Sequence, residues 1–428
     1  MPATNLLDLY PLLRLALLAA AVALLPLSWW WLRQRGTPLT PLTQRLAALT
    51  ALTVFLTFDL IVFGAFTRLS DSGLGCPDWP GCYGQASPLG AKLDIHAAMS
   101  TLPTGPVTTA KAWIEMLHRY LAMAVGLLIA VAAAISWRAR AALPHSAWWA
   151  TLTLGWVVVQ GLFGKYTVTL KLYPAIVTLH LLGAMLLLAL LVLQHESFRR
   201  RAPLAAALPV QPPADGALLP PAAGALQVKP IRATVVALVL GITLLQIALG
   251  GWVSTNYAVL ACTGFPACNG QWWPAMDLAQ GFTLLRELGR AGHGAYLNFD
   301  ALVAIHMAHR LFALVALTAL VWLVQRLWRQ PGRQARGYAL ALLVLLLWQA
   351  ASGLSNVVLG WPMVAALAHS AGAAGLVAVL TSLWARVRGN AAAVPSSPQA
   401  AASGAAAMGP RRRPVDAPRT AQHPVLRP

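Results

Sequence analysis

The sequence predicts an all-α integral membrane protein: two tandem four-helix bundles plus one extra N-terminal transmembrane helix, nine helices in all. Hydrophobic residues make up 58% of the 428 residues, charged residues only 10%, and the mean hydropathy is +0.65. Since about a quarter of the residues of an average soluble domain are charged, a soluble globular protein is excluded. Apolar runs of membrane-spanning length recur along the chain, and the polar residues within them occur in two matching sets.

Nine apolar runs reach the ~20 residues that a helix needs to cross a bilayer. The first stands outside the repeat near residues 9–32 and ends in tryptophans followed by Arg33 and Arg35, as expected for an anchored helix. The runs of the first bundle lie near residues 46–68, 113–137, 147–168 and 174–194. Those of the second bundle lie near residues 232–254, 301–325, 338–360 and 362–384.

These runs and the composition between them divide the chain into five segments. The extra helix occupies residues 1–44, the first repeat residues 45–201 and the second repeat residues 231–388. Residues 202–230 are rich in Ala and Pro, which predicts a flexible cytoplasmic linker. Residues 389–428 consist mostly of Ala, Pro, Ser and Arg, which predicts a disordered cytoplasmic tail.

The distribution of basic residues predicts the orientation. Of the 31 Lys and Arg residues, 21 fall on the side of the linker and the tail and 6 on the opposite side. The positive-inside rule then places the N-terminus in the periplasm and the C-terminus in the cytoplasm of a bacterial inner membrane, surrounded by lipids. The same distribution explains the net charge of +19 without a nucleic-acid partner, since no basic stripe alternates with aromatics.

Polar residues indicate that the second bundle repeats the first. The matched residues are Cys76 and Cys262, Cys82 and Cys268, His118 and His309, Arg119 and Arg310, Gln160 and Gln349, and His180 and His369. Their separations all lie between 186 and 191 residues. Each copy has an even number of helices, so we expect the copies to share one orientation about an axis along the membrane normal.

Four histidines lie inside predicted spans, two in each repeat at similar depth: His118 with His180, and His309 with His369. Ionisable residues in a bilayer are costly and are therefore candidates for function. Two imidazoles on facing helices can ligate a haem iron from both sides, so each pair is predicted to bind a haem. The haem would be b-type, because no Cys-x-x-Cys-His occurs. An interhelical hydrogen bond is the alternative for any single histidine.

Charged residues accompany these histidines. Arg119, Arg310 and Arg68 are candidate partners for haem propionates, with snorkelling to the interface as the alternative. Glu115 lies three residues before His118 on one helical face, whereas His306 takes that position before His309. A carboxylate beside one haem can relay protons, which suggests that the first bundle performs chemistry and the second holds a permanent cofactor. Glu115 reaching the aqueous interface is the alternative.

The four cysteines fall in two predicted external loops. In an oxidising compartment, disulfides Cys76–Cys82 and Cys262–Cys268 are expected. Either structural bridges or a redox-active first pair would fit this spacing.

The segment 64–82 with its Cys-Pro-Asp-Trp-Pro-Gly-Cys block, followed by Glu115-Met-Leu-His118-Arg119, resembles the haem A synthase family of bacteria and mitochondria. The resemblance extends from about residue 45 to 386. It implies stepwise oxidation of the C8 methyl of haem O to a formyl group, giving haem A for cytochrome c oxidase assembly. The implied partners are a haem O synthase that delivers haem O and an electron acceptor or donor. A homo-oligomer is also compatible with the sequence.

The resemblance also implies roles for individual residues. His118 and His180 would hold the substrate haem, and His309 and His369 would ligate the iron of haem b. Glu115 would be catalytic, and the pair Cys76 and Cys82 functionally important. The extra N-terminal helix and His306 depart from the family pattern.

Two other classes of function account for part of the pattern. A di-haem b electron-transfer cytochrome linked to quinol would use all four histidines but would not need Glu115 in only one repeat. A membrane thiol-disulfide oxidoreductase would use the cysteines and leave the histidines without a role.

Overall fold

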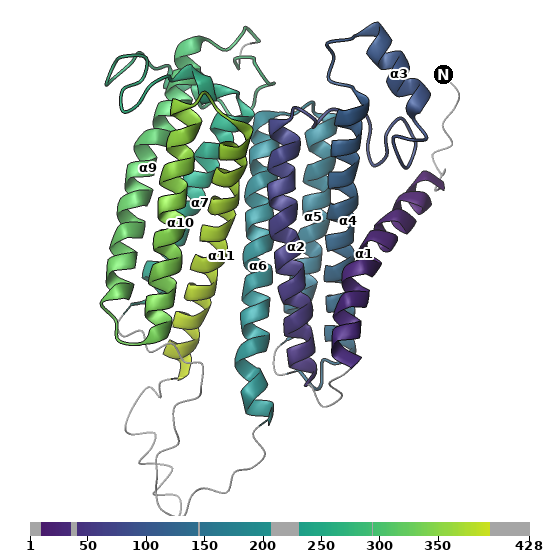
Figure 1. The fold of residues 1–428 in the computed structure, drawn as a ribbon, viewed down its shortest axis with the longest axis vertical. Helices are drawn as coiled ribbons and strands as arrows, with labels where there is room; N and C mark the ends of the chain where they lie inside the picture. The colour runs from purple at the N-terminus through teal and green to yellow at the C-terminus, as the bar shows by residue number, and fades with distance from the viewer. Residues whose placement is uncertain (1–9, 36–40, 144–145, 207–230, 293, 394–428) are drawn as a thin grey trace, which may run out of the picture. The chain divides into compact units, whose positions relative to one another are not determined.

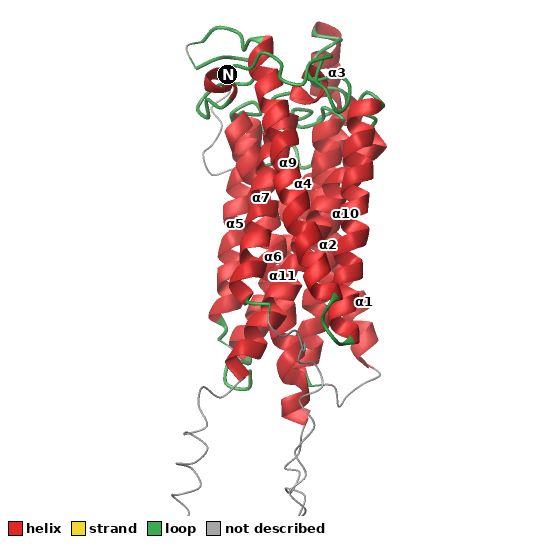
Figure 2. Ribbon diagram, turned by 90° about the vertical axis from the view of Figure 1, so that its left-hand side faces the viewer, coloured by secondary structure: helices red, strands yellow, loops and turns green. Residues whose placement is uncertain are grey.

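In the computed structural model, residues 10–35, 41–143, 146–206, 231–292 and 294–393 are described. Every regular element within these ranges is a helix, which confirms the predicted all-α class (Figure 2). The predicted linker and tail lie outside the described residues, except where the last residues of two helices extend into them.

Eight described helices are long and apolar enough to cross a membrane, as a multi-pass membrane protein requires. They are α1 (Tyr10–Arg35), α2 (Leu42–Leu69), α4 (Thr109–Arg138), α6 (Pro174–Ala206), α7 (Ala233–Thr255), α9 (Phe299–Trp328), α10 (Arg333–Val358) and α11 (Met363–Ala393). The ninth expected span is α5 (Trp148–Thr169), which lies in the first bundle beside α4 and α6 (Figure 1). It is not among the eight, because Gln160, Lys165 and several Gly and Thr residues make it more polar.

Both disulfide loops lie at one end of the bundles, named here the loop face (Figure 1, top). This face also carries three short helices that the sequence did not predict: α3 (Lys92–Thr101), the 3₁₀ helix η1 (Ala258–Ala261) and α8 (Leu278–Gly281). Only Ile95 of α3 is buried, so this surface helix lacks the periodic apolar pattern by which a helix is predicted.

The two bundles meet through one buried cluster built from repeat-related residues. Its members include Ile61 with Ile247, Met185 with Ala374, and Leu188 with Val377. The residues of each pair are 186 or 189 positions apart, as in the sequence repeat. Equivalent residues gather in one cluster when a two-fold axis passes between the copies. The packing therefore agrees with parallel copies related by an axis along the helices.

The extra helix α1 packs on the first bundle. Its Leu15 belongs to the same buried cluster as Met116 of α4 and the disulfide Cys76–Cys82. Near its other end, Trp30 Nε1 donates a hydrogen bond to the carbonyl oxygen of Arg45 at 3.1 Å. The helix thus supports both the first disulfide loop and the start of α2.

A buried ion pair joins α6 to α11 at the end opposite the loop face. Glu196 is 5% exposed and accepts hydrogen bonds from Arg386 at 3.1 Å and from Ser382 Oγ at 2.7 Å. Replacing Glu196 with Ala should lower the free energy of unfolding by about 2–4 kcal/mol, because Arg386 would keep a buried charge without its carboxylate.

Thermal unfolding in detergent checks this prediction. The matched variant is Glu287→Ala, which removes an exposed ion pair with Arg290 and should cost no more than ~1 kcal/mol. Equal shifts in the two melting temperatures would contradict the importance of the buried pair.

Candidate functional site

Each of the four predicted histidines lies against a glycine of a neighbouring helix in its own bundle. A Cβ atom added at Gly64 or Gly250 would lie 3.0 or 2.9 Å from the nearest imidazole carbon. The contacting pairs are Gly64 with His118, Gly164 with His180, Gly250 with His309, and Gly353 with His369. Since glycine has no side chain, the neighbouring helix leaves room for each imidazole at these positions. These glycines recur at the repeat offsets, a signal that sequence reasoning missed.

The two histidines of each bundle are close enough to interact electrostatically. Within the described residues, no three or more His, Cys, Asp or Glu side chains gather as a bare metal ion would require. Two imidazole nitrogens per bundle suit an iron whose remaining ligands come from a porphyrin. The residues present therefore fit a haem in each bundle.

The second bundle holds its histidines by hydrogen bonds. His369 Nδ1 lies 3.1 Å from Ser352 Oγ, and His309 Nδ1 lies 3.1 Å from the Gln246 side-chain amide. The same Gln246 side-chain nitrogen also donates a hydrogen bond to the backbone carbonyl oxygen of His309 at 3.2 Å. A hydrogen bond at Nδ1 fixes the imidazole and leaves Nε2 available to a metal.

The first bundle lacks these contacts. Nδ1 of His118 and Nδ1 of His180 are both buried without a hydrogen-bond partner. Leu60 and Phe163 occupy the positions equivalent to Gln246 and Ser352 at the repeat offsets. The two pairs of histidines therefore share a backbone arrangement but differ in how firmly each imidazole is held.

Glu115 lies near the loop face, one helical turn from His118, and is 4% exposed. Its carboxylate accepts a hydrogen bond from the backbone N–H of Cys76 at 2.8 Å and pairs with Arg119. The Arg119 guanidinium also donates to carbonyl oxygens of the disulfide loop, including that of Asp78 at 2.9 Å. The pair thus attaches the first disulfide loop to α4, and Glu115 does not extend to the aqueous interface.

Arg310 and His306 make related contacts in the second bundle. Arg310 donates a hydrogen bond to the carbonyl oxygen of Cys262 at 2.8 Å. His306 Nδ1 lies 3.0 Å from the carbonyl oxygen of Ala258. Arg68 instead crosses between the bundles, where it donates to Ser254 O at 2.6 Å. Neither Arg68 nor Arg310 forms an ion pair with a described carboxylate, whereas Glu115 neutralises Arg119. Arg68 and Arg310 are therefore better placed for an added anion.

The first disulfide loop approaches α4 closely at Gly75. A Cβ there would lie 2.5 Å from the backbone carbonyl carbon of Lys111, and backbone atoms cannot rotate away as a side chain can. We expect Gly75→Ala to lower the free energy of unfolding by about 2–3 kcal/mol. Thermal unfolding should show no loss for the control Gly161→Ala, since no heavy atom lies within 4 Å of that position. A Gly75→Ala protein as stable as the control would contradict this close packing.

All four cysteines form disulfides, Cys76 with Cys82 and Cys262 with Cys268. Each cysteine is at most 1% exposed. Thiol exchange requires a nucleophile to reach a sulfur atom, so this burial favours structural bridges over a redox-active pair.

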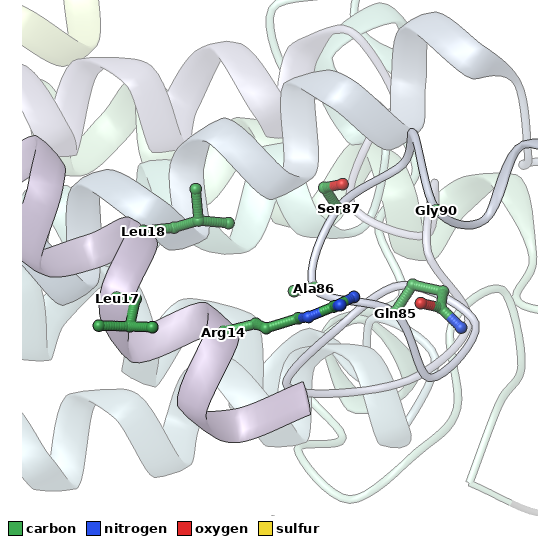
Figure 3. Close-up of a pocket in the computed structure, with 7 residues that line it drawn as sticks. All are labelled: Arg14, Leu17, Leu18, Gln85, Ala86, Ser87 and Gly90. Atoms are coloured by element: carbon green, nitrogen blue, oxygen red, sulfur yellow. The ribbon is translucent and has the colours of Figure 1, made fainter. Parts of the chain in front are cut away.

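A separate groove of about 280 Å³ lies between α1 and the first external loop (Figure 3). In Figure 3 the Arg14 side chain extends from α1 toward Ala86 and Gln85. The groove is lined by Arg14, Leu17, Leu18, Gln85, Ala86, Ser87 and Gly90. It does not include the histidines, so it is distinct from the sites inside the bundles.

Residues 47–381 match the family described as cytochrome oxidase assembly protein, COX15-CtaA. The chain is 34% identical to the heme A synthase of Shewanella oneidensis over 340 residues, which is 79% of this chain and 96% of that protein. It is 27% identical to the heme A synthase of Rhizorhabdus wittichii, over 81% of this chain and 94% of the relative. It is 26% identical to the heme A synthase of Shouchella clausii, over 73% of this chain and 86% of that relative. The matching family segment includes both bundles and leaves out α1.

Proposed function

The chain belongs to the COX15-CtaA family of cytochrome oxidase assembly proteins, and from this premise we propose that it is a haem A synthase. The enzyme would oxidise the C8 methyl group of haem O to the formyl group of haem A. With water as the source of the oxygen atom, this change breaks two C–H bonds, forms a C=O bond and releases four protons and four electrons. The electrons pass to an electron acceptor outside the protein. The product would serve the assembly of cytochrome c oxidase.

The observation that carries this proposal is the difference between the two matched pairs of histidines. Ser352 and the Gln246 amide hold the second pair, as axial ligands of a permanent cofactor are usually held. His118 and His180 lack such partners, as suits a ligand that must enter and leave at every turnover. We assign the substrate haem O to the first bundle and haem b to the second.

In the second bundle, His309 and His369 would ligate the haem b iron through Nε2, and bound haem b would supply one-electron transfer. Arg310 carries no carboxylate partner among the described residues and would face a propionate of this haem. Arg68 would serve the substrate haem in the same way. Arg119 is a weaker candidate, because Glu115 already neutralises it.

In the first bundle, His118 and His180 would position the porphyrin so that its reactive methyl group lies near Glu115. Removing hydrogen from a methyl group releases protons, and Glu115 would accept them as a general base. Its bonds to Cys76 and Arg119 hold the carboxylate in place near the loop face.

The basic residues support an inner-membrane location with the loop face toward the periplasm. Among the described residues, most Lys and Arg residues lie at or beside the helix ends opposite the loop face, as in cytoplasmic segments. The N-terminus would then lie in the periplasm and the C-terminus in the cytoplasm. Haem O, delivered by a haem O synthase, would enter from the lipid phase.

The test is co-expression with a source of haem O, followed by chromatography of the extracted haems. We expect haem A or its hydroxymethyl intermediate, which cells lacking this chain should not make. Extraction of haem b alone, with haem O unchanged, would instead support a di-haem electron-transfer cytochrome.

A further inference from the structure

Gln160 of α5 is a buried polar residue to which the proposed mechanism gives no role. It is 6% exposed, and neither Nε2 nor Oε1 of its side chain has a hydrogen-bond partner. Leaving an amide buried and unpaired is unfavourable, because it loses its hydrogen bonds to water without replacement. Such a group is expected to find its partner in a ligand.

The equivalent glutamine of the second bundle is satisfied by the protein. Gln349 Nε2 donates a hydrogen bond to the carbonyl oxygen of His369 at 2.8 Å. Both glutamines lie against a glycine of the next helix, Gly183 and Gly372, where an added Cβ would collide with the amide. The two amides therefore lie against equivalent glycines, and of the two only the Gln160 amide has no hydrogen bond to the described protein.

Gln160 lies at the depth expected for one edge of a porphyrin bound in the first bundle. Gln160 precedes Gly164, which contacts His180, by four residues and so lies on the same face of α5. Its amide contacts Gly183, three residues beyond His180 along α6 and away from the loop face. At about 1.5 Å per residue, the amide lies roughly 4–5 Å deeper than the ligating histidine. That depth is comparable to the distance from the iron to the outer carbons of a porphyrin.

The orientation of the porphyrin follows from charge. Its propionates are anionic and costly within a bilayer, so they face the loop face, where Arg68 and Arg119 lie. The opposite edge then points toward the bilayer centre and Gln160. In haem O that edge bears a hydroxyl group on its isoprenoid chain, where haem b has an apolar vinyl group.

We propose that Gln160 recognises the hydroxyl group of the haem O side chain and so selects haem O over haem b for the first bundle. This inference rests on the proposed function. The amide would both donate to the hydroxyl oxygen and accept its proton, and haem b would leave both amide atoms unpaired. A site that hydrogen-bonds a substrate hydroxyl discriminates against analogues that lack it.

The test uses purified protein that carries haem b in its second bundle. This protein is titrated with haem O and, in a separate experiment, with haem b. Absorbance then gives the affinity of the first bundle for each haem. In Gln160→Met, of similar size but without the amide, the preference for haem O should fall about 10- to 100-fold. Retained haem b in the second bundle would show that the variant is folded. The matched variant Gln349→Met should keep the wild-type preference, because its amide is bonded to His369.

An unchanged preference in Gln160→Met, or an equal loss of affinity for both haems, would overturn the proposal. Wild-type protein provides a test that no folding defect can affect: haem O acetylated at its hydroxyl group should bind about 10-fold more weakly than haem O. Equal binding would also overturn the role of Gln160. If the wild type converts haem O while these tests fail, only the inference about Gln160 is lost, whereas no conversion at all would reject the proposed function.

Discussion

Glu115→Gln is expected to lower the rate of haem A formation by about 100- to 10,000-fold, which is the contribution of a general base. The glutamine oxygen can still accept the Cys76 backbone hydrogen bond, so the first disulfide loop should remain attached to α4. What the variant loses is a carboxylate that can take up a proton and that neutralises Arg119. Chromatography of haems extracted after a fixed time of co-expression with a haem O source measures the effect.

Glu115 also has a structural contact, and the experiment must separate the two roles. The matched variant is His306→Gln, which changes the equivalent position of the second bundle, where the side chain contacts Ala258 rather than a disulfide loop N–H. It should retain haem A formation within about threefold, since no proton transfer is assigned to it. If Glu115→Gln were as active as His306→Gln, Glu115 would act only as a loop anchor. Loss of haem O binding in Glu115→Gln would also contradict a purely catalytic role.

The positions of the membrane helices could be predicted because apolar runs of spanning length have few alternatives in a bilayer. The run expected at 46–68 forms α2 (Leu42–Leu69), and the run expected at 301–325 forms α9 (Phe299–Trp328). Surface helices such as α3 have no comparable signal. The run expected at 147–168 forms α5 (Trp148–Thr169), but Gln160 and Lys165 make this helix more polar than the eight candidate spans.

The histidine positions could be read from the sequence because they repeat, but their hydrogen-bond partners could not. Gln246 contacts His309 across 63 residues of chain, and that contact depends on how α7 and α9 are rotated against each other. Gln246 and Ser352 have no matching residue in the first repeat, so a search for residues shared by the two copies does not find them. Arg119, a candidate partner for a propionate, also binds the carbonyl oxygens of a loop whose path the sequence does not reveal.

His369→Ala should lower the haem b content of the purified protein at least 10-fold, because the iron would lose an axial ligand that no neighbouring side chain replaces. Ser352→Ala tests how that ligand is held. It removes the contact to His369 Nδ1 together with a hydrogen bond to the Trp348 carbonyl oxygen within the same helix. Losing a bond that supports a metal ligand weakens metal binding by about 10- to 100-fold. Soret absorbance per protein measures both effects.

The matched variant in the first bundle is His180→Ala, which should retain haem b but no longer bind haem O. If His180→Ala and His369→Ala lost haem b equally, the two bundles would not have the separate roles assigned here. The Ser352 contact offers a second test of which bundle holds the permanent haem. Phe163 occupies the position of Ser352 in the first bundle, and its side chain offers no hydrogen bond. Introducing serine by Phe163→Ser should therefore slow the release of haem from the first bundle, and unchanged release would show that the hydrogen bond does not determine which haem stays.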